Sequence, residues 1–318
     1  MRVGVIGLGS MGRNHARILS DMGVLSAVCD SDPTVLAQHR SAHQYSDYRE
    51  MLAEENLDAV IIAAPTSLHY EMGMAAIKNG IPALIEKPIA GNVVDGEDLI
   101  LTAADNDVYV SVGLIERFNP AVIALKERRG QLGNVSQIII RRMGPFPSQI
   151  KDTGVILDLA VHDFDLIRIL SGSEIKSMYG LSSQLIHKDK EDSVVCIGET
   201  ESGVMITIIQ NWTTPTKIRD LTMHGDRGMF RVDLLTQDLT FYENNYTSAE
   251  WREMGIFRGV SEGGHTQYKI DRKEPLKLEI EEFLRCVGGG TKEVGASAVD
   301  GLIALRLAER LQSVCNHE

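Results

Sequence analysis

The sequence has no apolar run of membrane-spanning length, no run of lysine and arginine, and no closely spaced cysteine pair. A membrane-crossing helix needs about 20 consecutive apolar residues, so we expect no membrane partner. A net charge of −12 without a basic run argues against nucleic-acid binding. The cysteines are scattered, which predicts neither a metal site nor a disulfide framework; they are Cys29, Cys196, Cys286 and Cys315.

What is present is typical of a globular protein with two domains. The 318 residues are enough for two cores, and 43% hydrophobic and 24% charged residues are ordinary proportions. Residue 1 leads straight into a short apolar strand, so we expect no signal peptide and a cytoplasmic location.

A glycine-rich turn follows that first strand, at residues 2–6, and precedes a helical run at 14–19. Its sequence, Gly-Leu-Gly-Ser-Met-Gly, is the dinucleotide-binding pattern when it joins a strand to a helix. The first glycine permits a tight turn, the second lets the backbone approach a pyrophosphate, and the third allows close helix packing. The N–H groups that open the helix then face the anion. The alternative is that this glycine-rich turn binds no ligand. The expected contacts are Gly7, Gly9, Ser10, Met11 and Gly12.

Strands alternate with helices through the first 118 residues. Apolar strands are expected at 24–29, 57–64, 81–85 and 108–114. This alternation predicts a doubly wound parallel sheet, in which ligands bind beyond the carboxyl ends of the strands. Thr66 is expected to cap the helix that ends near Gly80. Residues at strand ends should converge on one cleft, and they are Asp30, Pro65, Thr66, Glu86, Lys87 and Pro88.

Asp30 ends the second strand, eighteen residues after Gly12. An acidic residue at this place binds the adenosine ribose, and its charge repels the 2′-phosphate of NADP. We therefore expect NAD as the cofactor. The alternative is that Asp30 is only a turn residue, and that Asp32 alone has a role, as the cap of a helix that starts at Pro33.

The pattern changes near Asn119, where a helix runs to Arg129 and long alternating strands follow. They predict a mostly antiparallel sheet with helices on one face and an open face, at which we expect a homo-oligomer interface, in a dimer or tetramer. A long loop is expected at 244–274, then helices from Pro275 to Gly288 and over 297–311. The predicted strands are 135–142, 177–186, 193–200, 204–212, 220–224, 229–235 and 239–243. The predicted class is α/β, with a Rossmann NAD-binding domain at 1–118 and an α+β substrate-binding and oligomerisation domain at 119–318.

Residues 154–170 predict a buried helix, because they are apolar almost all round. Asp158, His162 and Asp165 form one polar stripe on it, which must find partners or line a cavity. The alternative is that His162 has only a structural role and is paired with the aspartates of this stripe. Lys87, at a strand end that should face the cofactor, is either solvated or a donor to a reacting oxygen. The Lys87-Pro88 bond is a candidate cis peptide.

These motifs together resemble the Gfo/Idh/MocA family of NAD(P)-dependent sugar and cyclitol oxidoreductases. The pieces GLGSMG, AAPTSLH (63–69), EKP (86–88) and D-x-x-x-H (158–162) stand in the family's order, and the likeness covers essentially the whole chain. The resemblance implies a Rossmann domain, an open α+β domain and a Lys–Asp–His trio that maps to Lys87, Asp158 and His162. It also implies cofactor contacts at Ala64, Pro65, Thr66, His69, Glu86 and Lys87. Many members have a glycine pair where this chain has Thr153-Gly154, which leaves the local turn open.

Three further stretches, at 115–122, 141–165 and 211–219, are similar to archaeal-type UDP-N-acetylglucosamine 3-dehydrogenases. Basic residues here, including Lys217 and Arg219, could hold a diphosphate, or they could be ordinary strand-surface groups. The expected substrate contacts are Asn119, Arg141, Arg142, Lys151, Asp158 and His162.

The leading expectation is an NAD-dependent dehydrogenase that oxidises C3 of UDP-N-acetylglucosamine to the 3-oxo sugar nucleotide. His162 would remove the hydroxyl proton, Lys87 would donate a hydrogen bond to that oxygen, and Asp158 would orient or charge the histidine. The alternatives are a free-sugar or myo-inositol dehydrogenase of the same family and a non-catalytic NAD-binding sensor or regulator.

Overall fold

The computed structural model describes residues 1–147, 153–187, 189–245, 263–292 and 294–315. They divide into two compact units. The first unit takes the described parts of Met1–Phe118, Ser148–Asp165 and Lys273–Asn316, and the second takes those of Asn119–Pro147 and Leu166–Arg272. The division after residue 118 coincides with the domain boundary that we expect, but two later segments of the chain return to the first unit. Among the helices of the described residues, none is long and apolar enough to cross a membrane.

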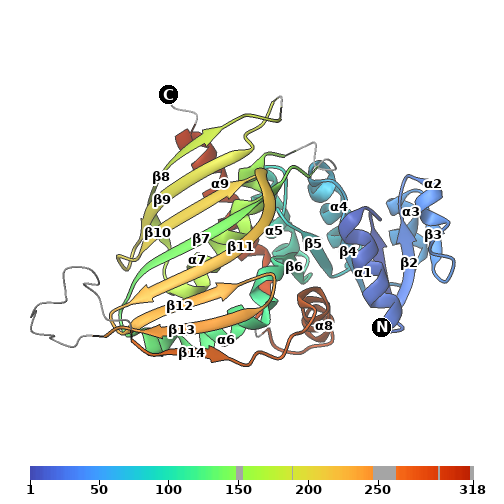
Figure 1. Cartoon of the computed structure of the whole chain (residues 1–318). Helices are drawn as coiled ribbons and strands as arrows, with labels where there is room; N and C mark the ends of the chain where they lie inside the picture. The colour runs from blue at the N-terminus through green and yellow to red at the C-terminus, as the bar shows by residue number, and fades with distance from the viewer. Residues whose placement is uncertain (148–152, 188, 246–262, 293, 316–318) are drawn as a thin grey trace, which may run out of the picture. The chain divides into compact units, whose positions relative to one another are not determined.

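The first unit is built on a seven-stranded sheet in the order β15-β6-β5-β4-β1-β2-β3. Figure 1 labels β6, β5, β4, β2 and β3 of this sheet. All neighbours pair in parallel except β15 with β6. The order reverses between β1 and β4, which is the topological switch point of a doubly wound sheet. The short strands β3 and β15 are additions to the prediction. The strands are β1 (Val3–Ile6), β2 (Leu25–Cys29), β3 (His43–Tyr45), β4 (Ala59–Ile62), β5 (Ala83–Glu86), β6 (Val110–Gly113) and β15 (Ala296–Ser297).

Each face of this sheet has its own apolar core, because successive side chains of a strand point to opposite faces. Ile61 packs in one core with Leu19 and Ile280, and its neighbour Ile62 packs in the other with Leu99. The prediction of a doubly wound sheet is therefore confirmed. The helices are α1 (Ser10–Asp21), α2 (Pro33–Leu36), α3 (Tyr48–Glu54), α4 (Thr66–Lys78), α5 (Val93–Asp105), α8 (Pro275–Val287), α9 (Ala298–Cys315) and the 3-10 turn η1 (Ile115–Phe118).

Thr66 does not cap α4 as predicted. The residue before the helix is Pro65, with φ −56° and ψ 144°, and no side chain caps this end. Thr66 is already the first helical residue, so its oxygen is not in the position of an N-cap acceptor. Asp32, in contrast, caps α2 by accepting a hydrogen bond from the Thr34 backbone N–H.

The second unit contains an eight-stranded sheet in the order β14-β13-β12-β11-β7-β10-β9-β8 (Figure 1). Only β7 and β10 pair in parallel, which confirms a mostly antiparallel sheet. The strands are β7 (Val135–Pro145), β8 (Ile175–Ser183), β9 (Ser193–Thr200), β10 (Met205–Asn211), β11 (Thr213–Gly225), β12 (Gly228–Asp233), β13 (Asp238–Glu243) and β14 (His265–Tyr268). The loop expected over 244–274 is wrong at β14, because this strand extends the sheet beside β13; residues 246–262 lie outside the described part of the chain.

One face of this second sheet is apolar and buried, and the other is open. Helix α6 (Pro120–Arg128), followed by the 3-10 turn η2 (Arg129–Leu132), packs against β12 and β13. On the open face, large apolar side chains of neighbouring strands are more than half exposed: Tyr179 68%, Leu181 66%, Ile197 55% and Met205 54%. Tyr179 lies directly across from Ile197 in the β8–β9 pair.

The segment predicted as one buried helix over 154–170 is a helix of two kinds. It begins as a π-helical turn, η3 (Ile156–Ala160), and continues as α7 (Val161–Ser171). π-helical turns are rare in proteins, and those that do occur are often found at functional sites. Asp158 lies in the π-helical turn and His162 in α7, so the two residues are not on one regular α-helix.

Candidate active site

The glycine-rich turn has the geometry that a dinucleotide requires. Gly7 has a φ of +84°, and a Cβ at Gly12 would lie 1.8 Å from the Gly7 carbonyl oxygen, so neither position tolerates a side chain. A Cβ at Gly9 would meet nothing within 4 Å, which leaves the turn open to a ligand. Helix α1 starts directly after Gly9, and no side chain caps its first N–H groups. These donors fit a pyrophosphate at the N-terminus of α1.

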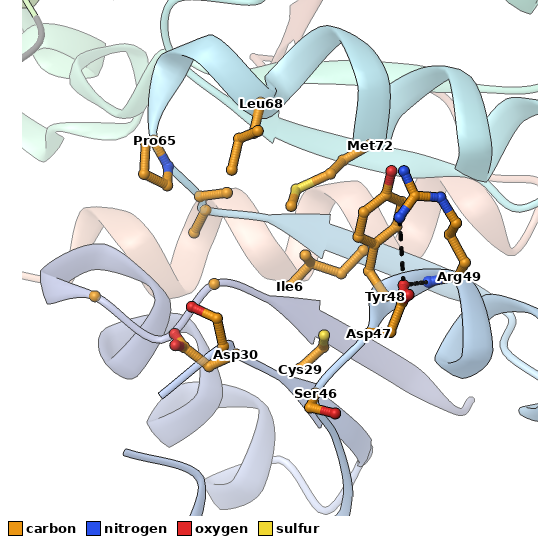
Figure 2. Close-up of a pocket in the computed structure, with 15 residues that line it drawn as sticks. Ile6, Cys29, Asp30, Ser46, Asp47, Tyr48, Arg49, Pro65, Leu68 and Met72 are labelled. Atoms are coloured by element: carbon orange, nitrogen blue, oxygen red, sulfur yellow. Dashed lines mark hydrogen bonds and ion pairs between the residues drawn. The ribbon is translucent and has the colours of Figure 1, made fainter. Parts of the chain in front are cut away.

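Asp30 links the end of β2 to this turn. Its carboxylate accepts hydrogen bonds from the Leu8 backbone N–H at 2.7 Å and from the Asp32 backbone N–H at 2.9 Å. The carboxylate therefore fixes the glycine-rich turn as well as facing the cavity beside it. Figure 2 shows Asp30 on the opposite side of this cavity from Pro65 and Leu68. The cavity has a volume of about 560 Å³, and its donor and acceptor groups fit the adenosine part of NAD.

The cavity has a further wall that sequence reasoning missed. It comes from the loop after β3 and the start of α3, where Ser46, Asp47, Tyr48 and Arg49 line the space (Figure 2). Burial and a hydrogen bond to Glu71 raise the pKa of Tyr48 to about 12. The Arg49 guanidinium pairs with Glu71 and lies 4.5 Å from the centre of the Tyr48 ring. The only signal in the sequence was the helix cap at Asp47, since β3 is too short to show a pattern.

Lys87 stands in an adjoining cavity of about 210 Å³, which shares Ala63, Ala64 and Pro65 with the first. The Lys87 Nζ donates hydrogen bonds to Asp158 twice, to Oδ1 at 2.5 Å and to the carbonyl oxygen at 2.8 Å. Both side chains are mostly buried, at 19% and 16% exposure. The peptide bond from Lys87 to Pro88 is cis, as predicted. A cationic donor is thus held beside the dinucleotide cavity.

Glu86 precedes Lys87, and its carboxylate is buried. The Glu86 Oε1 lies 2.8 Å from Nε2 of His15, which is fully buried on α1. Burial raises the pKa of Glu86, but the His15 hydrogen bond and the positive charges around it outweigh this and lower the pKa below its usual value. Glu279 on α8 feels the opposite effect: burial and the charge of Glu86 raise its pKa well above 4.5. Neither His15 nor Glu279 was a sequence candidate.

His69, on the first turn of α4, is 1% exposed and lines the Lys87 cavity. Its Nδ1 lies 2.7 Å from the Pro88 carbonyl oxygen, and its Nε2 lies 2.9 Å from the Ala64 carbonyl oxygen. Both carbonyls belong to walls of that cavity. The other predicted cofactor contacts at these walls, Met11, Thr66 and Glu86, line the same cavity.

The polar residues predicted to form one stripe on residues 154–170 have different partners in the structure. Asp158 is bound to Lys87, whereas Asp165 accepts a hydrogen bond from the Arg117 Nε at 2.7 Å, so the expectation of one shared stripe is wrong. Arg117 also pairs with Asp300 at 3.3 Å, and these carboxylates raise the pKa of its guanidinium despite the opposing effect of burial. His162 lies at the start of α7, is 8% exposed, and stands outside the residues that line either cavity in the described part of the chain.

The predicted substrate residues of the second unit have separate environments. Asn119 caps α6 and donates to the Leu234 carbonyl oxygen at 2.9 Å. Arg141 lies on the open face and binds Asp220 with its Nε at 2.8 Å. Arg142 points to the covered face, is 3% exposed, and stands opposite the buried Gln210 in the β7–β10 pair. The two arginines cannot hold one ligand together, because adjacent residues of a strand face opposite sides. Lys151 lies outside the described residues.

Two segments of the chain match models of one family. Residues 1–114 match "Oxidoreductase family, NAD-binding Rossmann fold" (GFO_IDH_MocA), and residues 127–231 match "GFO/IDH/MocA C-terminal domain". Together they cover more than half of the chain.

Among curated proteins, the UDP-N-acetylglucosamine 3-dehydrogenase of Acidithiobacillus ferrooxidans is 27% identical over 290 residues, covering 90% of this chain and 88% of the relative. The solved structure of that enzyme, GnnA, has a TM-score of 0.87 at 26% identity and covers 99% and 97% of the two chains. The scyllo-inositol 2-dehydrogenase (NAD(+)) of Bacillus subtilis is 27% identical over 328 residues, covering 96% of this chain and 92% of the relative. The WlbA dehydrogenase of Bordetella pertussis, solved with NADH and UDP-GlcNAcA, shares the fold at 21% identity, with a TM-score of 0.80 and coverage of 99% and 96%.

Proposed function

The chain belongs to the Gfo/Idh/MocA oxidoreductase family and carries its NAD-binding Rossmann domain, and from this premise we propose that it oxidises the C3 hydroxyl of UDP-N-acetylglucosamine. The observation that carries the dehydrogenase assignment is the Lys87–Asp158 pair in a cavity that adjoins the dinucleotide cavity. The nucleotide-sugar assignment draws its support from the resemblance to GnnA.

The reaction removes a hydride from a ring carbon and a proton from its hydroxyl oxygen, and a C=O double bond forms. Bound NAD supplies the hydride acceptor. From the family resemblance we assign this proton to His162, four residues after Asp158 in the chain, as the general base. Lys87 donates a hydrogen bond to the substrate oxygen as negative charge develops there, and Asp158 holds the lysine in place. The glycine-rich turn, the start of α1 and Asp30 hold the cofactor.

A second candidate is a free cyclitol or sugar as substrate. It is favoured by the B. subtilis scyllo-inositol dehydrogenase, which is as similar to this chain as the nucleotide-sugar enzyme. The two candidates differ in whether the protein recognises a diphosphate remote from the reacting carbon. Binding energy from such a remote group serves to align the sugar for hydride transfer.

The test is NAD reduction measured at 340 nm with a panel of UDP-sugars, free N-acetylglucosamine and inositols. We expect UDP-N-acetylglucosamine to give the highest kcat/KM, and free N-acetylglucosamine to lose about 1,000-fold or more because the remote binding energy is absent. Equal or better oxidation of an inositol would replace the nucleotide-sugar assignment by the cyclitol one. Absence of NAD reduction with the whole panel, from enzyme that binds NAD, would contradict the dehydrogenase assignment for these substrates.

The adjacent arginines of β7 offer a matched pair of variants for the same question. Arg142 lies on the covered face of the second sheet, between Gln210 of β10 and Arg219 of β11, whereas Arg141 lies on the open face and binds Asp220. We propose that only Arg142 contributes to substrate binding. Arg142→Gln should raise KM for the UDP-sugar by about 10-fold or more, since charged hydrogen bonds to phosphate are strong. Arg141→Gln should leave that KM unchanged, and equal effects would refute the distinction.

We also propose that a second copy of the chain covers the open face of the second sheet. The exposed apolar residues Tyr179, Leu181 and Ile197 lie side by side on it, and exposed apolar patches mark interfaces. Leu181→Lys should lower the molar mass found by light scattering, whereas Leu235→Lys, at an exposed leucine off this sheet face, should leave it unchanged. A monomeric wild type at micromolar concentration would exclude the interface.

A further inference from the structure

His69 is held by two groups of the same kind. Its ring nitrogens both face backbone carbonyl oxygens, of Pro88 at 2.7 Å and of Ala64 at 2.9 Å. A carbonyl oxygen accepts hydrogen bonds and carries no proton to donate. A neutral imidazole has one N–H and one lone pair, so in either tautomer one of these contacts would set a lone pair against an oxygen. Only the imidazolium, with two N–H groups, satisfies both contacts.

The surroundings of His69 can stabilise a positive charge. The ring is 1% exposed, and a buried charge without a partner is costly. Glu86 supplies the compensating carboxylate: the charge of His69 is one of the effects that lower the pKa of Glu86, after the opposing effect of burial and the larger contributions of His15 and Lys87. Lys87 and Asp158, which line the same cavity, form a neutral pair of their own.

The two carbonyls belong to different walls of the Lys87 cavity. Ala64 lies between β4 and α4 and also lines the dinucleotide cavity, so its wall borders on the cofactor. Pro88 directly follows Lys87, so its wall carries the proposed donor to the substrate oxygen. A single ring on the first turn of α4 therefore joins the cofactor wall to the lysine wall.

We propose that His69 is a positioning residue, an imidazolium whose two N–H groups clamp the cofactor wall to the lysine wall of the active-site cavity. It does not touch the reacting atoms. It fixes the separation between the segment beside the cofactor and the segment that carries Lys87, and a small displacement between reacting groups is enough to slow a reaction severely. This inference concerns turnover and therefore rests on the proposed dehydrogenase function, but the protonation state and the cofactor affinity can be measured without it.

Two conservative variants separate the two contacts. The amide nitrogen of His69→Asn can take the position of Nδ1 and keep the bond to Pro88, while that of His69→Gln can take the position of Nε2 and keep the bond to Ala64. We expect the Asn variant to raise the Kd for NAD by about 10-fold, which is the size typical of a lost charge-assisted hydrogen bond. Its kcat should stay within about threefold of wild type. The Gln variant should show the reverse, with kcat reduced about 10-fold and the Kd for NAD nearly unchanged. Tyr70→Phe, at the next residue of α4, removes a bond to Asp98 and serves as the control without effect on either constant.

A spectroscopic measurement tests the protonation state independently of activity. In protein labelled with ¹⁵N-histidine, the His69 ring, assigned by its loss in His69→Gln, should show two protonated nitrogens at pH 7. One protonated and one bare nitrogen would overturn the proposal, and so would equal effects of the Asn and Gln variants on Kd and kcat. If wild type binds NAD and shows the imidazolium but oxidises no sugar, the clamp stands and the proposed function fails. If it oxidises the UDP-sugar with a neutral His69, the function stands and the clamp fails.

Discussion

The discrimination between NAD and NADP should depend on the charge of Asp30. The Asp30 carboxylate is half-buried at the adenosine cavity and fixed by the N–H groups of Leu8 and Asp32. A 2′-phosphate on the ribose would bring a second negative charge beside it. Arg49 lines the same cavity, but Glu71 already neutralises its guanidinium.

The magnitude follows from Coulomb's law. Two unit charges 4 Å apart repel by about 1 kcal/mol in water and about 4 kcal/mol at a protein surface of lower dielectric constant. Half-buried Asp30 lies between these limits, so wild type should bind NADH more tightly than NADPH by roughly 5- to 1,000-fold. Asp30→Asn removes the repulsion, but its single oxygen can no longer accept from both Leu8 and Asp32 in the same way. We therefore expect the preference to fall while NADH binding also weakens.

A second substitution distinguishes charge from loop distortion. Glu71→Gln removes the partner of Arg49 and leaves Asp30 intact, so this variant alone should change the preference little. Combined with Asp30→Asn, it should let Arg49 approach the phosphate and improve NADPH binding beyond the single variant. The measurement is the Kd of NADH and NADPH by nucleotide fluorescence at low ionic strength. Equal affinity of wild type for both cofactors, or an unchanged ratio in Asp30→Asn, would refute the reasoning.

Three other predictions follow from single contacts. Lys87→Met should reduce kcat by about 100- to 1,000-fold with the Kd for NAD unchanged, because it removes the donor to the developing oxyanion; normal turnover would refute this role. Glu279→Gln should alter the pH dependence of stability. The raised pKa of Glu279 means that wild type loses stability as pH rises above about 4.5, by up to about 1.4 kcal/mol per pH unit, until that carboxyl ionises. The variant should lack this slope in urea unfolding at pH 5 to 8, and parallel curves would contradict the buried carboxyl. Arg117→Leu should lower the unfolding free energy by about 3–5 kcal/mol, because it removes the guanidinium that forms a buried ion pair with the Asp165 carboxylate; calorimetry should show the lower midpoint.

Elements with a strong local pattern could be predicted from the sequence. The strand Ser193–Thr200 has the predicted bounds, and the helix from Pro275 ends before Gly288 as its proline and glycine indicate. The missed strands are short or polar. β3 and β14 are mostly exposed along their length, so they show no apolar alternation, and β15 is defined only by pairing with β6, far away in the sequence.

The site was predictable where topology alone determines position. Asp30, Glu86 and Lys87 end parallel strands, so the doubly wound sheet brings them to one edge. The sequence could not show that Asp158 binds Lys87, because the two are 71 residues apart and the contact depends on tertiary packing. The opposite orientations of Arg141 and Arg142 were, in contrast, predictable from the period of a strand, since adjacent side chains alternate.

The number of N–H donors on Lys87 relates the site's geometry to its chemistry. A lysine ammonium has three donors, and among the described residues Asp158 takes two of them, with its carboxylate and its carbonyl oxygen. One donor is left for a ligand, which matches a single hydroxyl oxygen that becomes an alkoxide and then a carbonyl. The carboxylate of the preceding Glu86 has a contact of its own, because its Oε1 lies 2.8 Å from Nε2 of His15. Asp158 therefore limits Lys87 to one partner and fixes where that partner must lie.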